Sequence, residues 1–212
     1  MSKSVASTIT WTLRGGHLCL DFANTADWHA SDQPEERLTS YEEFVSWSQQ
    51  AGVLTEEQAK HLFRRAADRP EQVKAVLKRA IVLREAIYEI FAAVAHEQSA
   101  EATDLTTLNS ALSEALAHSQ IAPTETGFDW QWAGEEDALD RPLWSIARSA
   151  ADLLTSNELQ RVGQCADDRG CGWLFLDTSR NHTRHWCSIN DCGNRAKARR
   201  HYERKRSVSE AA

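Results

Sequence analysis

The sequence lacks the features that mark membrane proteins, secreted proteins and repeat proteins. It has no apolar run long enough to span a bilayer, and the stretch from Met1 to Val5 lacks the apolar core of a secretory signal. No segment repeats with a period of roughly 20 to 50 residues, and no stretch is of low complexity. We therefore expect a cytoplasmic protein with no membrane partner.

Known catalytic signatures are missing as well. The chain contains no Gly-rich phosphate loop, no Gly-x-Ser-x-Gly nucleophile motif and no His-Glu-x-x-His motif. We predict that the protein is not an enzyme. The alternative is a catalytic site near His17, Asp21 and His29, but their spacing matches no known catalytic arrangement.

Cysteine is scarce, with five in the whole chain, and four of these form two close pairs towards the C-terminal end. The pairs read Cys-x5-Cys and Cys-x4-Cys with fifteen residues between them, which supplies four thiolates for the tetrahedral shell of structural zinc. We therefore predict one structural Zn2+ ion. Its predicted ligands are Cys165, Cys171, Cys187 and Cys192.

Two alternatives compete with this zinc site. Disulfides would need an oxidising compartment, which the missing signal segment disfavours. His182 or His185 would replace one cysteine as a ligand, although four thiolates already complete a tetrahedral shell. The remaining cysteine, Cys19, is expected to be a small apolar filler or an ordinary free thiol.

The residues around the cysteines predict a treble-clef-like zinc finger, made of a hairpin and a helix. Trp173 to Leu176 and the return segment from Arg184 to Trp186 form a hairpin pattern around a polar turn. After Cys192 the chain has no helix breaker and is rich in good helix formers, so we expect a helix from Gly193 onward.

Positive charge is concentrated in this finger. The formal net charge of the chain is -7, but residues 161–206 hold eleven Lys or Arg and five Asp or Glu, a net +6, whereas residues 1–160 carry -12. A zinc ion with four thiolates adds about -2, so the finger stays positive. This predicts a nucleic-acid partner, with duplex DNA as the first choice. The predicted contact residues are Arg180, Arg184, Arg195, Lys197, Arg199, Arg200, Arg204 and Lys205.

Apolar periodicity in residues 1–160 predicts a mainly helical domain. Two of the helical patterns begin with capping boxes, and the longest keeps apolar side chains at helical spacing for about seven turns. The predicted helices begin near Ser40, Thr55, Glu71, Asp104 and Asp140.

Two stretches of this domain alternate as strands do. Thr8 to Phe22 alternates around Gly15-Gly16, which predicts an antiparallel hairpin. Phe128, Trp130 and Trp132 predict a third strand added to it, with its aromatic row packed in the core. The fold class is therefore α+β, mainly α with a small antiparallel sheet. The expected buried face of the hairpin comprises Ile9, Trp11, Leu13, Leu18, Leu20 and Phe22.

Polar residues beside the predicted hairpin are candidates for a small-molecule pocket, because loops next to rigid strands often hold ligands. The alternative, which their residue types favour, is that they hydrogen-bond one another and cap the next element. The candidate pocket residues are His17, Asp21, Asn24, Thr25 and Trp28.

These features predict three parts: residues 1–160 as a regulatory or sensor domain, residues 161–206 as the finger, and residues 207–212 as a disordered tail. No long linker separates the first two, so we expect them to pack together.

Two sets of motifs resemble a known family. Cys171-Gly-Trp-Leu-Phe-Leu-Asp177 together with Cys192-Gly-Asn-Arg195 resembles the bacterial CGNR zinc finger. The segment from Gly15 to Thr25 resembles the N-terminal domain that accompanies this finger, described as a stress-induced transcription regulator. The resemblance implies zinc on the four cysteines and a DNA-binding transcriptional regulator.

We expect the acidic domain of such a regulator to sense a ligand or a partner. The alternative is an RNA-binding or protein-interaction module in which the zinc is purely structural. A homodimer would be typical of a regulator that reads paired half-sites, although the sequence shows no dimer seam.

Overall fold

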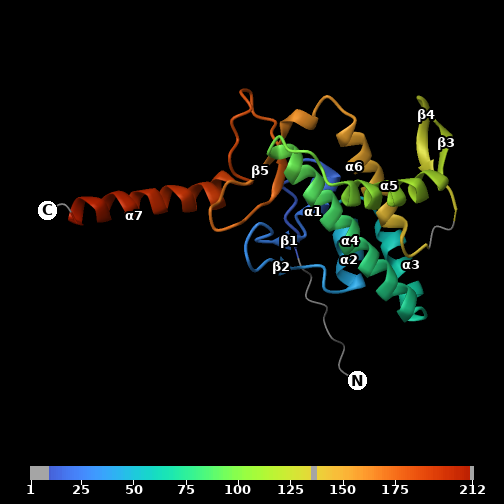
Figure 1. Ribbon diagram of the computed structural model, residues 1–212. Coiled ribbons are helices and arrows are strands. Elements are labelled where there is room, and N and C mark those ends of the chain that lie inside the picture. The colour runs from blue at the N-terminus through green and yellow to red at the C-terminus, as the bar shows by residue number, and fades with distance from the viewer. Residues whose placement is uncertain (1–9, 135–137, 211–212) are drawn as a thin grey trace, which may run out of the picture.

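A computed structural model of the chain describes residues 10–134 and 138–210. Figure 1 shows a helical body with a β-hairpin protruding at one end and a long helix projecting from the opposite end. No helix in these ranges is long and apolar enough to cross a membrane.

The body is built from helices and three separate antiparallel strand pairs, which confirms a mainly α protein of class α+β. The helices are α1 Leu18–Ala23, α2 Tyr41–Gln50, α3 Glu56–Ala67, α4 Pro70–Ala95, α5 Ala102–Ala117, α6 Arg141–Leu154 and α7 Asn194–Glu210, with short helical turns η1 Leu159–Arg161 and η2 Ile189–Gly193. The strand pairs are β1 Ala26–Asp27 with β2 Glu35–Glu36, β3 Ser119–Thr124 with β4 Gly127–Trp132, and β5 Val162–Gln164 with β6 Leu174–Leu176.

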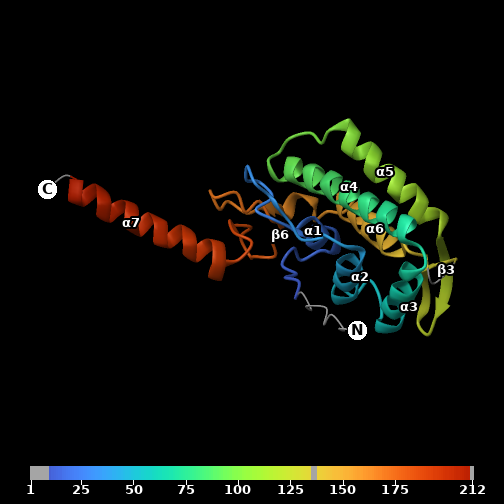
Figure 2. The same cartoon turned by 90° about the horizontal axis from the view of Figure 1, so that it is seen from below.

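The predicted helices of the body form as expected from their local signals. Ser40 caps α2 and Thr55 caps α3, and in each capping box the side chain three residues later bonds back to the cap. Helix α4 starts with Pro70 in its first turn, where a missing N–H costs nothing. Figure 2 shows α4, α5 and α6 side by side, and α1 packs against α4, α6 and β6.

The N-terminal hairpin prediction was wrong, because its second half is helix α1. Cys19 and Ala23 are as completely buried as Leu20 and Phe22, so residues of both alternating sets are buried, whereas a half-buried strand would bury only one set. The backbone of this helix is paired locally through the bonds from Asp21 N to His17 O and from Asn24 N to Leu20 O, and the Cys19 amide donates to Ser149 Oγ. Leu13 is partly exposed, contrary to expectation, while Trp11 is buried. Thr8 and Ile9 lie outside the described residues.

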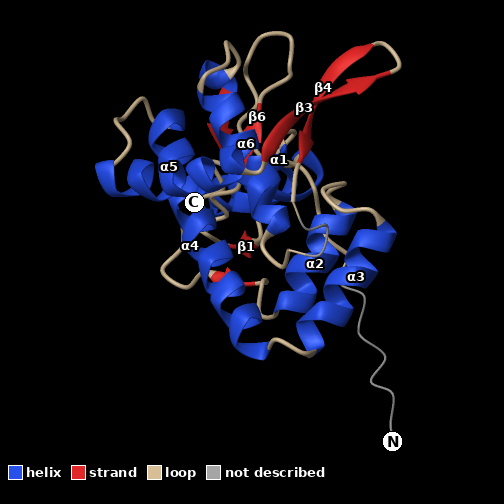
Figure 3. Cartoon of the chain, turned by 90° about the vertical axis from the view of Figure 1, so that its right-hand side faces the viewer, coloured by secondary structure: helices blue, strands red, loops and turns tan. Residues whose placement is uncertain are grey.

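The aromatic row is a strand, but it neither joins the N-terminal segment nor lies in the core. Strand β4 pairs with β3, and Phe128 and Trp130 are 79% and 52% exposed. Trp132, nearest the body, donates from Nε1 to Ser145 Oγ over 3.0 Å. The two-stranded sheet extends beyond the helices that would have to cover it, which Figure 3 shows, so the row is buried only at its base.

The finger hairpin also has a different second strand. Strand β6 pairs with β5, before the first cysteine, and not with the segment from Arg184 to Trp186. That segment instead approaches the first cysteine, because the amide of Ala166 donates to His185 O over 2.9 Å. The predicted C-terminal helix is confirmed as α7, which continues to Glu210, whereas a disordered tail was expected from residue 207. Residues 211–212 lie outside the described residues.

The finger hairpin packs into the hydrophobic core of the helical domain, while the four cysteines form a separate buried cluster with Trp173 and Phe175. Val162, Leu174 and Leu176 of the finger hairpin belong to the same buried cluster as α1 and α4. Asn24, itself buried, accepts from the Leu174 amide and donates to the Leu174 carbonyl, both over 2.8 Å. The two units therefore pack together, as their short connection predicts.

Candidate metal centre and nucleic-acid interface

The four cysteines of the finger converge on one buried point. The Sγ atoms of Cys165, Cys171, Cys187 and Cys192 all lie within 4.8 Å of one another. Cys187 Sγ lies 3.7 Å from Cys171 Sγ and 3.6 Å from Cys192 Sγ. A tetrahedron with Zn–S bonds of about 2.3 Å has edges of about 3.8 Å, so the thiolates fit one structural zinc ion.

Loops with specific backbone geometry bring these thiols together. Gly170 and Gly172 flank Cys171 with φ of 84° and 66°, the left-handed region that glycine adopts without strain. The Cys165 amide donates to Trp173 O over 2.8 Å, which ties the first ligand to the second loop. The last ligand, Cys192, lies in the π-helical turn η2, directly before α7. Zinc thus fixes the start of α7 to the finger hairpin.

Arg195, in the first turn of α7, completes the metal centre. Its Nη2 donates to Cys192 Sγ over 2.8 Å, and its Nε donates to Asp167 Oδ2 over 3.0 Å. Its guanidinium lies 5.2 Å from the ring centre of Trp28. A cation in this position offsets part of the negative charge of a zinc ion with four thiolates. The sequence predicted Arg195 as a nucleic-acid contact, but the structure turns it towards the metal.

Asp167 is the acidic member of this group. Burial alone would raise the pKa of its carboxyl, but the Arg169 amide and the Arg195 guanidinium outweigh burial and hold that pKa below its usual value. The side chain is therefore ionised at neutral pH. An ionised Asp167 orients Arg195 towards the sulfur and keeps the guanidinium from turning to solvent.

Replacing Arg195 with Ala is expected to weaken zinc binding about 10- to 100-fold, because groups that hydrogen-bond metal ligands typically contribute this much. Competition with a chromophoric chelator measures the change. Arg200→Ala is the matched control, because Arg200 lies on the same helix and its bond is to the backbone of Ala196. Equal zinc affinity in the two variants would show that the Arg195 contact does not support the metal.

Arg184, another predicted nucleic-acid contact, also points inward. It donates to the carbonyl of Cys187 over 2.6 Å and to that of Trp186 over 3.0 Å. Its guanidinium lies 4.2 Å from the ring centre of Phe175. These contacts hold the loop before the third zinc ligand, so Arg184 is engaged in the finger's own structure.

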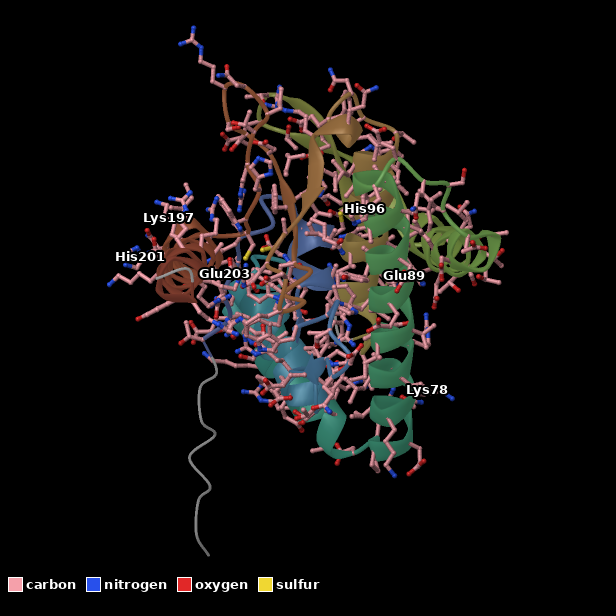
Figure 4. All side chains as sticks on the ribbon, turned by 60° about the vertical axis from the view of Figure 1, so that its left-hand side comes forward. Lys78, Glu89, His96, Lys197, His201 and Glu203 are labelled. Carbon is pink, nitrogen blue, oxygen red and sulfur yellow. The ribbon has the colours of Figure 1, made fainter. Side chains whose placement is uncertain are left out.

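Helix α7 divides the remaining predicted cations between two faces. Arg199 lies on the same side as Arg195 and forms an ion pair with Asp168. Lys197, Arg200 and Arg204 recur at the i, i+3, i+7 spacing of a second face. In Figure 4, Lys197 and His201 lie on the outer side of α7, and Glu203 lies towards the body. We name Lys197, Arg200, His201, Arg204 and Lys205 the outer face of α7.

The outer face is open to solvent. All five of its side chains are exposed. Lys197 and Lys205 make no ion pair with any carboxylate in the described part of the chain. Arg180 is exposed on the loop after β6, apart from this helix. Lys197, Lys205 and Arg180 are therefore positioned to meet an external polyanion.

The inner side of α7 carries cations that sequence reasoning missed. A groove of about 440 Å3 between α7 and the loop before Cys171 is lined by Arg169, Arg199, Tyr202 and Arg206, among others. The Arg169 guanidinium lies 4.8 Å from the ring centre of Trp28. Arg169 stands before Cys171 in the chain and far from the basic run, so only the folded loop places it beside α7.

The five candidate pocket residues take up different roles. Trp28 lines a cavity of about 170 Å3 beside the zinc thiolates. Thr25 Oγ1 donates to Phe22 O over 2.8 Å, and Asp21 Oδ1 accepts from the Gly15 amide over 2.7 Å. Together with the Asn24 bonds to Leu174, these contacts hold α1 and its flanking turns.

Each residue of the alternative catalytic site has a separate set of contacts. His17 Nδ1 lies 3.1 Å from Ser149 Oγ, and burial lowers its pKa. His29 Nε2 lies 2.8 Å from Glu85 Oε2, and its ring stacks on Tyr88 at 3.5 Å. Asp21 is bound to a backbone amide. The three side chains thus act on different parts of the fold.

Comparison with known families assigns both parts of the chain. Residues 16–157 match ABATE, described as "Putative stress-induced transcription regulator", and residues 161–205 match the CGNR zinc finger. The first match covers more than half of the chain. The chain belongs to the ABATE family. No curated protein matches it. The family is of a regulatory type, and its CGNR finger here holds the four clustered cysteines of one zinc site.

Proposed function

We propose that this ABATE-family chain is a cytoplasmic transcriptional regulator whose helix α7 binds duplex DNA. The observation that carries the proposal is the placement of charge on a projecting helix. Helix α7 leaves the body, and the cations of its outer face are exposed. Its inner cations, Arg195 and Arg199, are paired with Asp167 and Asp168.

A single α-helix fits the major groove of B-DNA, and exposed Lys and Arg along it reach phosphates on the flanking backbone. The zinc centre fixes the first turn of α7, so the helix is presented in one orientation. The acidic domain, at -12, would repel DNA and leaves the finger as the contact surface.

Removing three cations from the outer face tests this proposal. The variant Lys197→Ala, Arg200→Ala, Arg204→Ala is expected to bind duplex DNA about 500-fold more weakly near 0.1 M salt, with a salt slope reduced by about 2.7, because each lost phosphate contact removes about 0.9 from that slope. Fluorescence anisotropy over a salt series measures both quantities.

The matched control is Lys60→Ala, Lys74→Ala, Lys78→Ala, which removes the same charge from exposed positions on α3 and α4. It is expected to bind nearly as wild type does. A triple outer-face variant with wild-type affinity would disprove the assignment of α7. Preference for structured RNA over duplex DNA at fixed salt would identify an RNA-binding module instead.

We infer that the acidic domain governs how the finger is presented. A ligand or partner that moves α1 would act on β6 directly, because Asn24 joins them. Stability and zinc affinity of an Asn24 variant test whether the two parts are coupled in this way.

A further inference from the structure

The β3–β4 hairpin has one apolar and one polar face. Its register places Ile121 opposite Trp130 and Pro123 opposite Phe128, so these four side chains share a face. Asp129 and Gln131 lie on the other face, because successive side chains of a strand alternate. We name Ile121, Pro123, Phe128 and Trp130 the hairpin patch.

The described residues leave the hairpin patch largely exposed. Ile121 is 56% exposed, Trp130 52% and Phe128 79%. At its base the Arg148 guanidinium lies 4.7 Å from the ring centre of Trp130. Large aromatic side chains gathered on an exposed face mark an interaction site, and an isolated two-stranded hairpin is only marginally stable by itself. The hairpin therefore gains stability if something packs on this face.

We propose that a second copy of this chain covers the hairpin patch, with the two apolar faces packed about a two-fold axis. Of the surface of this acidic chain, the hairpin patch offers a second copy little charge to repel it. The chain carries -7, so most of its surface repels another copy, but residues 119–132 contain two charged side chains, Glu125 and Asp129, of which Asp129 lies on the polar face.

The border of the patch is also self-complementary. Glu125 lies in the turn at the tip of the hairpin, and Arg148 lies beside its base. A two-fold axis that lies between the two faces and runs across the strands sets the hairpins antiparallel, so the tip of each meets the base of the other. Glu125 of one copy then approaches Arg148 of the second. Arg148 donates to Asp152 through Nε, and its Nη atoms can donate to this second carboxylate.

The size of the patch is that of a small interface. The exposed parts of Ile121, Phe128 and Trp130 amount to about 400 Å2 per copy, or about 800 Å2 in the pair. Stable interfaces bury about 1,200–2,000 Å2, so an interface of this size belongs to the weak, transient class. The hairpin lies at the end of the molecule opposite α7, so dimerisation leaves α7 open and is independent of DNA binding (Figure 1).

Sedimentation equilibrium of the full-length, zinc-loaded chain from about 1 to 200 μM tests the dimer, because a weak dimer is expected to dissociate at micromolar concentrations. The wild-type mass is expected to rise from monomer to dimer. Phe128→Ser, Trp130→Ser should weaken association at least about tenfold, since it removes the two largest anchors of the patch. The control Val82→Ser, Leu116→Ser changes side chains that are 49% and 48% exposed on α4 and α5, and should leave the dimer intact.

Unfolding temperature and zinc content of every variant verify that it is folded. If the double variant is unfolded, the single variant Phe128→Ser replaces it in the sedimentation experiment, because the Phe128 side chain is 79% exposed at the hairpin tip. A wild-type chain that stays monomeric throughout the range would overturn the proposal and leave a different protein as the occupant. A folded hairpin variant that dimerises as wild type does would equally overturn it.

Discussion

Replacement of Cys187 by Ser is expected to abolish zinc binding and to unfold the finger. Cys187 Sγ is within 3.7 Å of two other ligand sulfurs, so its loss leaves an incomplete shell. Structural zinc contributes about 10–16 kcal/mol in small fingers, comparable with the whole stability of a domain, about 5–15 kcal/mol. Elemental analysis should find one zinc per chain in the wild type and below about one-tenth of that in the variant.

The destabilisation caused by Cys187→Ser should extend beyond the finger into the helical domain. Val162, Leu174 and Leu176 lie in the common core, so the helical domain loses packing when the finger hairpin unfolds. Thermal unfolding is therefore expected to shift as one transition to lower temperature. Cys19→Ala is the control, since Cys19 is buried beside Ser149 and away from the metal. Full zinc content in Cys187→Ser would disprove the four-thiolate site and point to His182 or His185 as a ligand.

Replacement of Asn24 by Ala is expected to destabilise the protein by about 2–6 kcal/mol, since it leaves the N–H and C=O of Leu174 without their bonds and each buried unpaired group costs about 1–3 kcal/mol. Leu174 is fully buried, so water cannot replace the lost amide. Urea denaturation measures the change in the free energy of unfolding. Zinc affinity should fall too, because β6 leads from the second zinc ligand into the core.

Asn157→Ala is the control for this substitution. Asn157 is exposed on the loop after α6, so its loss should change the free energy of unfolding by less than about 0.5 kcal/mol. If Asn24→Ala were as stable as Asn157→Ala, the finger would not depend on α1. Unchanged zinc affinity with reduced stability would separate the packing of the two units from the geometry of the metal centre.

Several features could be predicted from the sequence because their causes are local. The zinc ligands follow from the spacing of four cysteines, since a tetrahedral thiolate shell needs little beyond two short loops. The capping boxes at Ser40 and Thr55 act within a single turn. Helix α7 lacks any breaker after Gly193. The capping boxes and helix α7 depend only on neighbouring residues. The zinc site also needs the two cysteine pairs to come together in the fold.

The direction in which each arginine points could not be predicted in the same way. Arg195 and Arg200 belong to one basic run and read alike as phosphate contacts. Their roles differ because Asp167, nearly thirty residues earlier, folds back beside Arg195, while Arg200 points outward. Charge counts predict that a helix is basic, but the position of acidic side chains around it decides which face is free.

The sequence by itself determined the metal chemistry, the helical class and the basic end of this protein, because thiolate spacing, apolar periodicity and net charge are properties of short segments. The tertiary structure alone decided that the segment after Gly16 is the buried helix α1, that Phe128 and Trp130 of β4 are exposed, and that the finger hairpin packs into the core of the helical domain. Each of these three features depends on contacts between segments that are distant in the chain. Alternation of apolar residues shows which side chains can be buried, but it does not show which element will cover them.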